Sequence, residues 1–355
     1  MRSAPAGRAV HLVVPAGIDD PACPSGGNTY DRRLADGLGT IGWSVRLHSV
    51  AGAWPEGDGE AHAALEDALR GLPDGSVVVV DGLVGSLAPA VLVPASRRLR
   101  LVVLAHMPFG QLGGSQSHDE CAVLTAATAV VTISEWCRDW LLRAYPVDPA
   151  TVHVAPPGVD PADPAPGGDG GNLLCVAAVT PGKGHDLLLE ALARNADLDW
   201  CCSFVGTVNR APEFVDRLRL RARTLGLADR VPVVGPRTGA ELVASYAAAD
   251  ALVLASRAES YGMVVTEALA HGLPVLATEV GGLPEALGHA PDGRRPGILM
   301  RPDDVDSIAS SLRRWLADRD VRHDLRAAAL QRRIGLPGWP VTADRVGRVL
   351  DGVAR

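Results

Sequence analysis

The sequence predicts an α/β protein made of two doubly wound domains, each with a parallel sheet covered by helices. Its 355 residues are enough for two domains of ordinary size. Short apolar runs rich in Val, Leu and Ala alternate with longer segments of helical periodicity, as in parallel strands joined by helices. The segment 156–171, crowded with Pro, Gly and Asp, separates two such series.

The first series predicts six strands with helices between them. Two of these helices are expected over Thr29–Gly39 and Ala61–Leu69, where apolar residues lie three and four positions apart. The expected strands are Val10–Val14, Ser44–Val50, Val77–Val80, Arg100–Leu104, Ala129–Ile133 and Val152–Ala155.

The second series predicts six further strands. We expect a first domain over 1–160, a linker over 161–171 and a second domain over 172–335, facing each other across a cleft. In such folds, ligands bind outside the carboxyl ends of the strands. The expected strands are Leu173–Val179, Trp200–Val205, Arg230–Val234, Ala251–Ala255, Pro274–Thr278 and Gly297–Met300.

Composition narrows the class of protein. The chain is 47% apolar and 21% charged, as in globular proteins, and no apolar run reaches the roughly 18 residues of a membrane-spanning helix. No secretory signal is recognised, so a soluble, cytoplasmic protein is expected. The net charge of -7 argues against nucleic acid as a partner. Arg97, Arg98 and Arg100 would give at most weak peripheral contact with an anionic membrane, and the six cysteines are expected to be thiols.

One cationic residue differs from all the others. Lys183 is the single lysine among 34 lysines and arginines, and it lies between Gly182 and Gly184. A lysine ammonium is a compact point charge, whereas an arginine guanidinium is a planar fork. The position therefore indicates either a cramped anion site or the chance survival of one lysine.

Two motifs are expected to be structural. Gly37, Gly39 and Gly42 fit the spacing of a dinucleotide loop, but they end a helix and precede a strand, so a helix terminus is expected. Two Asp-x-Asp triplets, at 197–199 and 304–306, precede a strand and begin a helix respectively. We therefore expect no metal site.

The stretch 251–275 carries the clearest chemical signal. A strand is followed by a turn with Glu259 and then by a helix that begins near Gly262 and carries Glu267 one turn later. Free backbone amides at the start of a helix bind anions, and glycine allows a phosphate to approach closely. The two carboxylates could accept hydrogen bonds from sugar and ribose hydroxyls, or they could be solvated surface residues.

This stretch resembles the donor-site signature of glycosyltransferase family 4. The features that carry the resemblance are the two glutamates separated by seven residues, the Glu-Ala-x-Ala-x-Gly-x-Pro-Val that starts at Glu267, and Gly281-Gly282-Leu283-Pro284-Glu285. The resemblance extends to Gly26-Gly27, to Gly42-Trp43-Ser44-Val45, to Pro157-Gly158-Val159-Asp160 and to the loop Val179–Gly184.

The resemblance implies a GT-B fold with two Rossmann-like domains, a last helix at 336–355 that returns to the first domain, and a retaining hexosyltransferase without a cofactor. The donor would be a nucleotide-diphosphate sugar, and the acceptor a small molecule, a glycan or a glycolipid. Lys183 would bind the donor diphosphate, Glu259 the hydroxyls of the transferred sugar and Glu267 the ribose. His106 would lie near the anomeric centre. Further donor-binding residues would be Gly26, Gly27, Ser260, Tyr261, Gly262, Met263 and Val264.

The sequence departs from the family pattern at one position. The family commonly has an arginine five residues before the loop lysine, where this chain has Ala178. Arg237 or Arg257 could supply the missing charge, or the helix amides and Lys183 could suffice. A glycoside phosphorylase that uses sugar phosphates and a non-catalytic nucleotide-sugar-binding protein remain alternatives.

Overall fold

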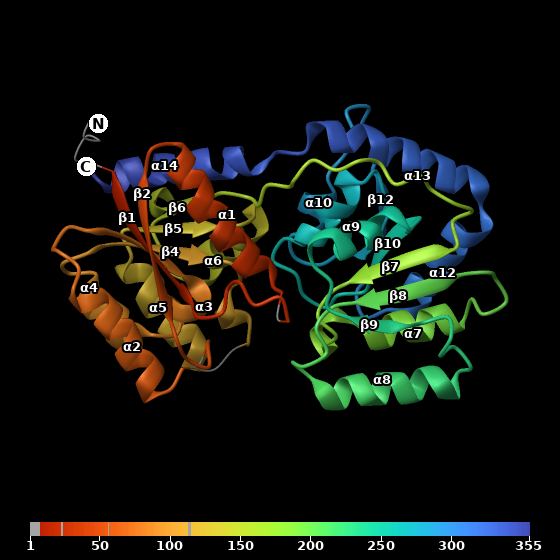
Figure 1. Ribbon diagram of the computed structural model, residues 1–355, viewed down its shortest axis with the longest axis horizontal. Helices are drawn as coiled ribbons and strands as arrows, with labels where there is room; N and C mark the ends of the chain where they lie inside the picture. Colours follow the sequence, from red (N-terminus) through yellow and green to blue (C-terminus); the bar gives the residue numbers. More distant parts are fainter. Residues whose placement is uncertain (1–7, 23, 56, 113–114) are drawn as a thin grey trace. The chain divides into compact units, whose positions relative to one another are not determined.

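The computed structural model describes residues 8–22, 24–55, 57–112 and 115–355 (Figure 1). The chain forms two compact units. Unit 1 contains the amino-terminal strand, Ser25–Gly158 and Pro337–Arg355. Unit 2 is formed chiefly by Val159–Leu336. Cys23 lies outside the described residues, and the other five cysteines are free thiols.

Unit 1 contains a six-stranded sheet in the order β2-β1-β3-β4-β5-β6, and all neighbouring strands are parallel. The expected strands are confirmed, with ends that shift by one or two residues. They are β1 Ala9–Pro15, β2 Ser44–Val50, β3 Val77–Asp81, β4 Arg100–Ala105, β5 Ala129–Thr132 and β6 Val152–Val154.

Polar side chains cap four helices of unit 1, α1, α2, α3 and α6. Ser25 Oγ accepts a hydrogen bond from Asn28 N at 3.1 Å, so the first helix begins at Gly26, three residues earlier than expected. The helices are α1 Gly26–Thr40, α2 Gly59–Arg70, α3 Gly82–Gly85, α4 Pro89–Ala95, α5 Ser115–Ala126, α6 Glu135–Ala144 and α14 Trp339–Val353, with short 3-10 turns η1 Phe109–Leu112 and η2 Pro149–Thr151.

The last helix packs within unit 1. A Cβ built on Gly37 of α1 would lie only 2.7 Å from Ala343 Cβ of α14, so the two helices are in close contact. Tyr30 meets Trp339 edge-on, with ring centroids 5.7 Å apart. Thr342 Oγ1 also donates a hydrogen bond to Pro156 O at 2.7 Å.

Unit 2 contains a second parallel sheet, in the order β12-β11-β10-β7-β8-β9. Its strands also confirm the expected positions. They are β7 Asn172–Val176, β8 Cys201–Val205, β9 Val233–Gly235, β10 Ala251–Leu254, β11 Val275–Thr278 and β12 Gly297–Met300. Because β7 and β10 are neighbours, the loops that follow them lie side by side at the carboxyl edge of the sheet.

Helices cover both faces of the second sheet (Figure 1). They are α7 His185–Ala193, α8 Pro212–Thr224, α9 Gly239–Ala247, α10 Met263–Ala270, α11 Leu283–Leu287, α12 Val305–Ala317 and α13 Arg319–Arg332, with 3-10 turns η3 Pro181–Lys183 and η4 Arg333–Gly335.

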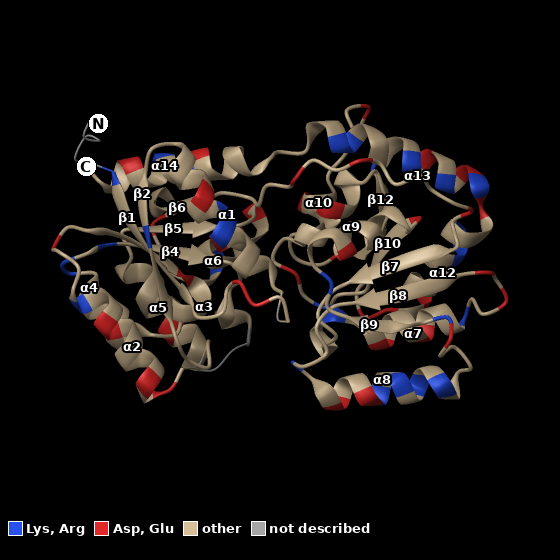
Figure 2. Ribbon diagram, in the orientation of Figure 1, with Lys and Arg blue, Asp and Glu red and all other residues tan. Residues whose placement is uncertain are grey.

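Charged side chains are interspersed on most helices, and α8 and α13 are rich in arginine (Figure 2). Two of the three arginines considered for membrane contact bind neighbouring backbone instead. Arg98 donates to Leu72 O at 2.7 Å, and Arg100 donates to Val353 O at 2.5 Å. Among the helices of the described residues, none is both long and apolar enough to cross a membrane.

The segment between the two series has no helix or strand over 155–171, as its composition predicts. It packs against unit 2 through Asp250, a buried residue that precedes β10. The Asp250 carboxylate accepts hydrogen bonds from the backbone amides of Gly170 at 3.1 Å, of Asn172 at 3.0 Å and of Gly168. One side chain therefore accepts from two amides of the irregular segment and from the first amide of β7.

We predict that Asp250→Ala lowers the free energy of unfolding by about 3 kcal/mol, because three backbone amides lose their acceptor together. Urea unfolding followed by circular dichroism measures this loss. Asp169→Ala is the matched control, since exposed Asp169 caps only the Gly171 amide and should cost less than about 1 kcal/mol. Equal losses in the two variants would contradict the prediction.

Candidate functional site

Most of the predicted site residues lie at the carboxyl edge of the second sheet. Lys183 follows β7, Arg237 follows β9, and 259–264 follow β10. Parallel strands direct all these loops to the same edge. The strand order alone therefore brings the loop of Lys183 and the loop of Glu259 together.

The lysine loop is held directly against the end of β10. Gly184 has a φ of 66°, and a Cβ built on it would lie 1.9 Å from Ala255 O, so no other residue fits there. Arg257 N donates a hydrogen bond to Gly182 O at 2.9 Å. These contacts fix the backbone on both sides of Lys183.

Lys183 and Glu259 form an ion pair. Lys183 Nζ lies 2.7 Å from Glu259 Oε1, which also accepts a hydrogen bond from Ser256 Oγ at 3.1 Å. The lysine side chain is 30% exposed and that of Glu259 is 12% exposed. The ammonium can therefore reach a ligand while it stays paired with the carboxylate.

Arg257 is already engaged with other residues. Its guanidinium makes two hydrogen bonds of 2.9 Å to Asp186 and one of 2.8 Å to Asp303. Although burial raises the pKa of Asp186, the bound guanidinium holds it below its usual value. Of the two arginines expected to replace the charge absent at Ala178, Arg257 is therefore the less available.

Arg237 has fewer contacts. Its Nη1 donates to Ser245 Oγ at 2.8 Å, and within the described part of the chain no ion pair involves it. Arg237 therefore stays the candidate for the missing charge.

The start of α10 offers backbone amides to a ligand. Its N-cap, Gly262, has a φ of 91°, and a Cβ there would lie 2.4 Å from Leu283 Cδ2. No side chain caps the helix. The amides around Met263 and Val264 thus have the arrangement that binds anions. Ser260 and Tyr261 belong to the same loop, and Tyr261 is buried.

Glu267 is half-buried one turn into α10. Its Oε2 accepts a hydrogen bond from Tyr246 Oη of α9 at 2.7 Å. Burial raises the pKa of Glu267, the Tyr246 hydrogen bond opposes this, and the charge of Asp160 adds to it. The carboxylate is therefore costly for the ligand-free fold and would gain from hydroxyl donors on a ligand.

We predict that Glu267→Gln raises the Tm of the ligand-free protein at pH 8 more than at pH 5. A raised pKa in the folded state means that stability is present at low pH and is lost as the pH rises, and glutamine removes this loss. Each kcal/mol should correspond to about 2–4 °C. Thermal unfolding of both proteins at the two pH values tests this, and an equal difference at both would contradict it.

His106 lies in unit 1, directly after β4. Its Nε2 is 3.0 Å from Asp31 Oδ1 on α1 and 3.9 Å from Asp81 Oδ2 at the end of β3. Both aspartates are buried. Sequence reasoning missed them, although Asp81 follows four valines at a strand end and Asp31 shares the buried face of α1 with Leu34 and Leu38.

The three side chains are of types that also bind metals, and their atoms lie within 4.8 Å of one another. The 3.0 Å separation of Nε2 and Oδ1 is a direct hydrogen-bond distance, and we interpret the cluster as hydrogen-bonded. That no metal binds remains a prediction.

The two glycines at the start of α1 differ from expectation in one respect. Gly26 and Gly27 lie in the first turn of the helix and not in a loop before it, because Ser25 caps the helix. A Cβ on Gly27 would lie 3.4 Å from His106 Cδ2. The absence of a side chain thus lets the helix start lie against the imidazole.

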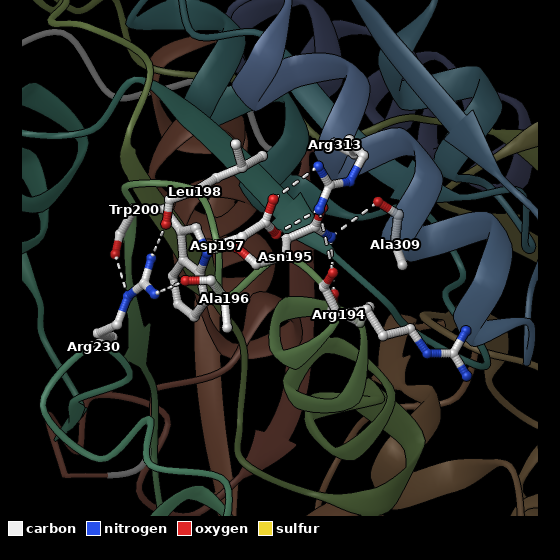
Figure 3. Close-up of polar contacts among 10 residues, drawn as sticks. Arg194, Asn195, Ala196, Asp197, Leu198, Trp200, Arg230, Ala309 and Arg313 are labelled. Atoms are coloured by element: carbon white, nitrogen blue, oxygen red, sulfur yellow. Dashed lines mark hydrogen bonds and ion pairs between the residues drawn. The ribbon is translucent and has the colours of Figure 1, made fainter.

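The motifs expected to be structural behave as predicted. Gly37 and Gly39 lie in the last turns of α1, and Gly42 follows with a φ of 93°. Asp197 precedes β8 and accepts a hydrogen bond from Arg313 Nη1 of α12 at 3.1 Å. Figure 3 shows the two side chains pointing toward each other.

The second triplet also has structural partners. Asp304 caps α12 by accepting from Ser307 N at 2.8 Å, and Asp306 pairs with Arg194.

Comparison with known proteins now decides the family. A model described as "Glycosyl transferases group 1" matches residues 161–332, and one described as "Glycosyltransferase Family 4" matches residues 22–163. The chain belongs to glycosyltransferase family 4. It is 33% identical over 324 residues to a D-inositol 3-phosphate glycosyltransferase of Catenulispora acidiphila, a match that covers 83% of this chain and 76% of that protein.

A second family 4 relative and two solved structures are also similar. A D-inositol 3-phosphate glycosyltransferase of Kineococcus radiotolerans is 34% identical over 261 residues, and the match covers 67% of this chain but only 59% of that relative. The sucrose-phosphate synthase of Thermosynechococcus elongatus has a TM-score of 0.79 at 21% identity, covering 98% of this chain and 99% of that one. Anabaena HepE in complex with UDP-glucose has a TM-score of 0.77 at 17% identity, covering 97% and 99%. This family 4 glycosyltransferase has the GT-B fold.

Proposed function

We propose that this glycosyltransferase moves a hexosyl group from a nucleotide-diphosphate sugar to an acceptor hydroxyl, with retention of the α configuration and without a metal. The observation that carries the proposal is the pairing of Lys183 with Glu259 beside the uncapped start of α10. A diphosphate and a sugar need these two kinds of partner side by side.

The cationic side of the site suits the leaving group. As the glycosidic bond breaks, negative charge develops on the diphosphate, and Lys183 together with the α10 amides would stabilise it. Arg237 would add a second cation from the end of β9. Donor binding would draw the ammonium of Lys183 toward phosphate and leave Glu259 to accept hydrogen bonds from sugar hydroxyls.

The half-buried carboxylate of Glu267 could bind the nucleoside of the donor. Glu267 keeps three lone-pair positions beyond the Tyr246 hydrogen bond, and two adjacent ribose hydroxyls are donors of the right kind. In the proposed reaction the acceptor oxygen attacks C1 on the face that the diphosphate leaves. The bond between C1 and the diphosphate oxygen breaks, and the proton of the acceptor hydroxyl passes to the leaving diphosphate. A concerted route and a double displacement remain alternatives.

The substrates to test first follow from the relatives. HepE is described in complex with UDP-glucose, and the two curated relatives are named for D-inositol 3-phosphate. We therefore propose a UDP-hexose as donor and a small polyol as acceptor, with inositol 3-phosphate and unphosphorylated inositol as the paired first tests. A glycan or glycolipid acceptor is the next class.

We predict that Lys183→Gln lowers kcat/KM for the donor by about 10²–10³-fold, because one stabilising group of the leaving diphosphate is lost. Lys183→Arg should also lose most activity, since the planar guanidinium cannot replace the ammonium in the tight turn before Gly184. Release of nucleoside diphosphate from UDP-, GDP-, ADP- and dTDP-sugars, measured in the presence of EDTA, gives the rates.

Arg217→Gln is the matched control, because exposed Arg217 on α8 forms only a 3.9 Å ion pair with Glu213. It should leave kcat/KM unchanged. Wild-type rates in both Lys183 variants would reject the proposed role. Turnover of a sugar phosphate without any nucleotide would indicate a phosphorylase, and donor binding without release of diphosphate would indicate a non-catalytic protein.

A further inference from the structure

His106, Asp31 and Asp81 form a buried cluster that the proposed function does not explain. The elements that carry them, β4, α1 and the end of β3, converge at one corner of unit 1. Both aspartate side chains are almost completely buried, whereas the histidine is 14% exposed. Two ionised carboxylates beside one imidazolium would leave an uncompensated negative charge in the core.

Such a charge is expensive to bury, and a cluster of this kind lowers the cost by taking up a proton. Asp31 Oδ2 is sealed from solvent and, within the described residues, has no hydrogen-bond partner. The ligand atoms of Asp31, Asp81 and His106 all lie within 4.8 Å of one another. A proton on Asp81, shared with the Asp31 oxygen, would give that oxygen a partner and remove the excess charge.

We infer that Asp31 and Asp81 are positioning residues of the transfer reaction, which share one proton and hold His106 as an imidazolium whose Nδ1 donates a hydrogen bond to a substrate oxygen. This inference rests on the proposed function, because it assigns the role of His106 in it. Nε2 forms a hydrogen bond with Asp31. Among the described residues, Nδ1 has no hydrogen-bond partner, and it is not one of the polar atoms that are fully buried without one.

The other groups around the ring do not change this balance. Tyr30 meets the imidazole edge-on, with centroids 5.3 Å apart, but its hydroxyl donates to Ala155 O. Leu83 N donates to Asp81 Oδ1 at 2.6 Å. The positive end of α1, at Gly27, opposes a cation on the ring.

The pKa values agree with the geometry. Burial alone lowers the pKa of His106, but the charges of Asp81 and Asp31 outweigh burial and raise it to about 9. Burial, together with the charge of Asp31, raises the pKa of Asp81 well above its usual value. At neutral pH, His106 thus has no lone pair to take a proton from the acceptor hydroxyl. It acts on a substrate oxygen as a donor and not as a general base.

Titration of the ligand-free protein tests the charge assignment. The full chain is labelled at histidine, and His106→Gln assigns the His106 signal in heteronuclear NMR. We expect a pKa near 9 in the wild type. Asp31→Asn should lower it clearly, because the ionised partner 3.0 Å from Nε2 is lost, whereas Asp81→Asn should leave it raised, because asparagine replaces a carboxyl group that is already neutral. Asp67→Asn, a change of one exposed acid on α2, is the control and should leave the titration unchanged.

A wild-type pKa of 6.5 or lower would overturn the inference, and so would a pKa that Asp31→Asn does not lower. A pKa that falls as far in Asp81→Asn as in Asp31→Asn would mean that Asp81 is ionised, and it would overturn the shared proton. If both variants fail to fold, the wild-type titration decides alone. This measurement needs no substrate, so it is independent of the proposed function.

Kinetics test the positioning role. The basic limb of kcat/KM against pH should lie near 9 in the wild type and move to lower pH in Asp31→Asn. A merely structural aspartate would lower Tm without moving that limb, and this result would overturn the positioning role. A His106 pKa near 9 without turnover of any nucleotide sugar would reject the proposed function and leave the charge assignment standing.

Discussion

The arrangement of unit 2 depends on one constraint, the adjacency of β7 and β10 in a parallel sheet. Because these strands are neighbours, the loops that carry Lys183 and Glu259 meet, and their side chains pair at 2.7 Å. The Arg257 guanidinium donates to Pro181 O in the lysine loop and pairs with Asp186 and Asp303, so it links the loop to these residues. In the proposed function, the Lys183 ammonium interacts with both the Glu259 carboxylate and the donor phosphate. The pairing with Glu259 would therefore lower the affinity for the donor that Lys183 could otherwise provide.

Both units keep carboxyl groups where a stable core would have none. Glu267 in unit 2 is half-buried, and Asp31 and Asp81 in unit 1 are buried. Asp31 Oδ2 has no hydrogen-bond partner among the described residues. Burial of polar groups without full hydrogen bonding lowers stability. A ligand or a proton can supply the hydrogen bonds that such groups lack. We therefore interpret Glu267 in unit 2 and the cluster around His106 in unit 1 as parts of functional sites.

The sequence was sufficient to predict the twelve strands and the carboxyl edge at which most of the residues predicted to bind the donor lie. Alternating apolar runs and the positions of Gly184 and Gly262 are local signals, and the fold follows from them. The cluster of His106, Asp31 and Asp81 was not predicted, because these residues are 25 or more positions apart and come from three elements. Asp31 in an apolar helical face and Asp81 after a valine strand are each unremarkable alone. The engagement of Arg257 likewise depends on Asp303, which is distant in sequence.

The place of α14 bears on the order in which the chain folds. Unit 1 contains residues from both sides of unit 2, and α14 covers α1 through Trp339, Ala343 and Gly347. During synthesis, the surface of α1 that packs against α14 stays uncovered until unit 2 and then α14 have been made. Unit 2 is nearly continuous in sequence and can close first. The amino-terminal unit, although most of it is synthesised first, is therefore the last to have all of its residues.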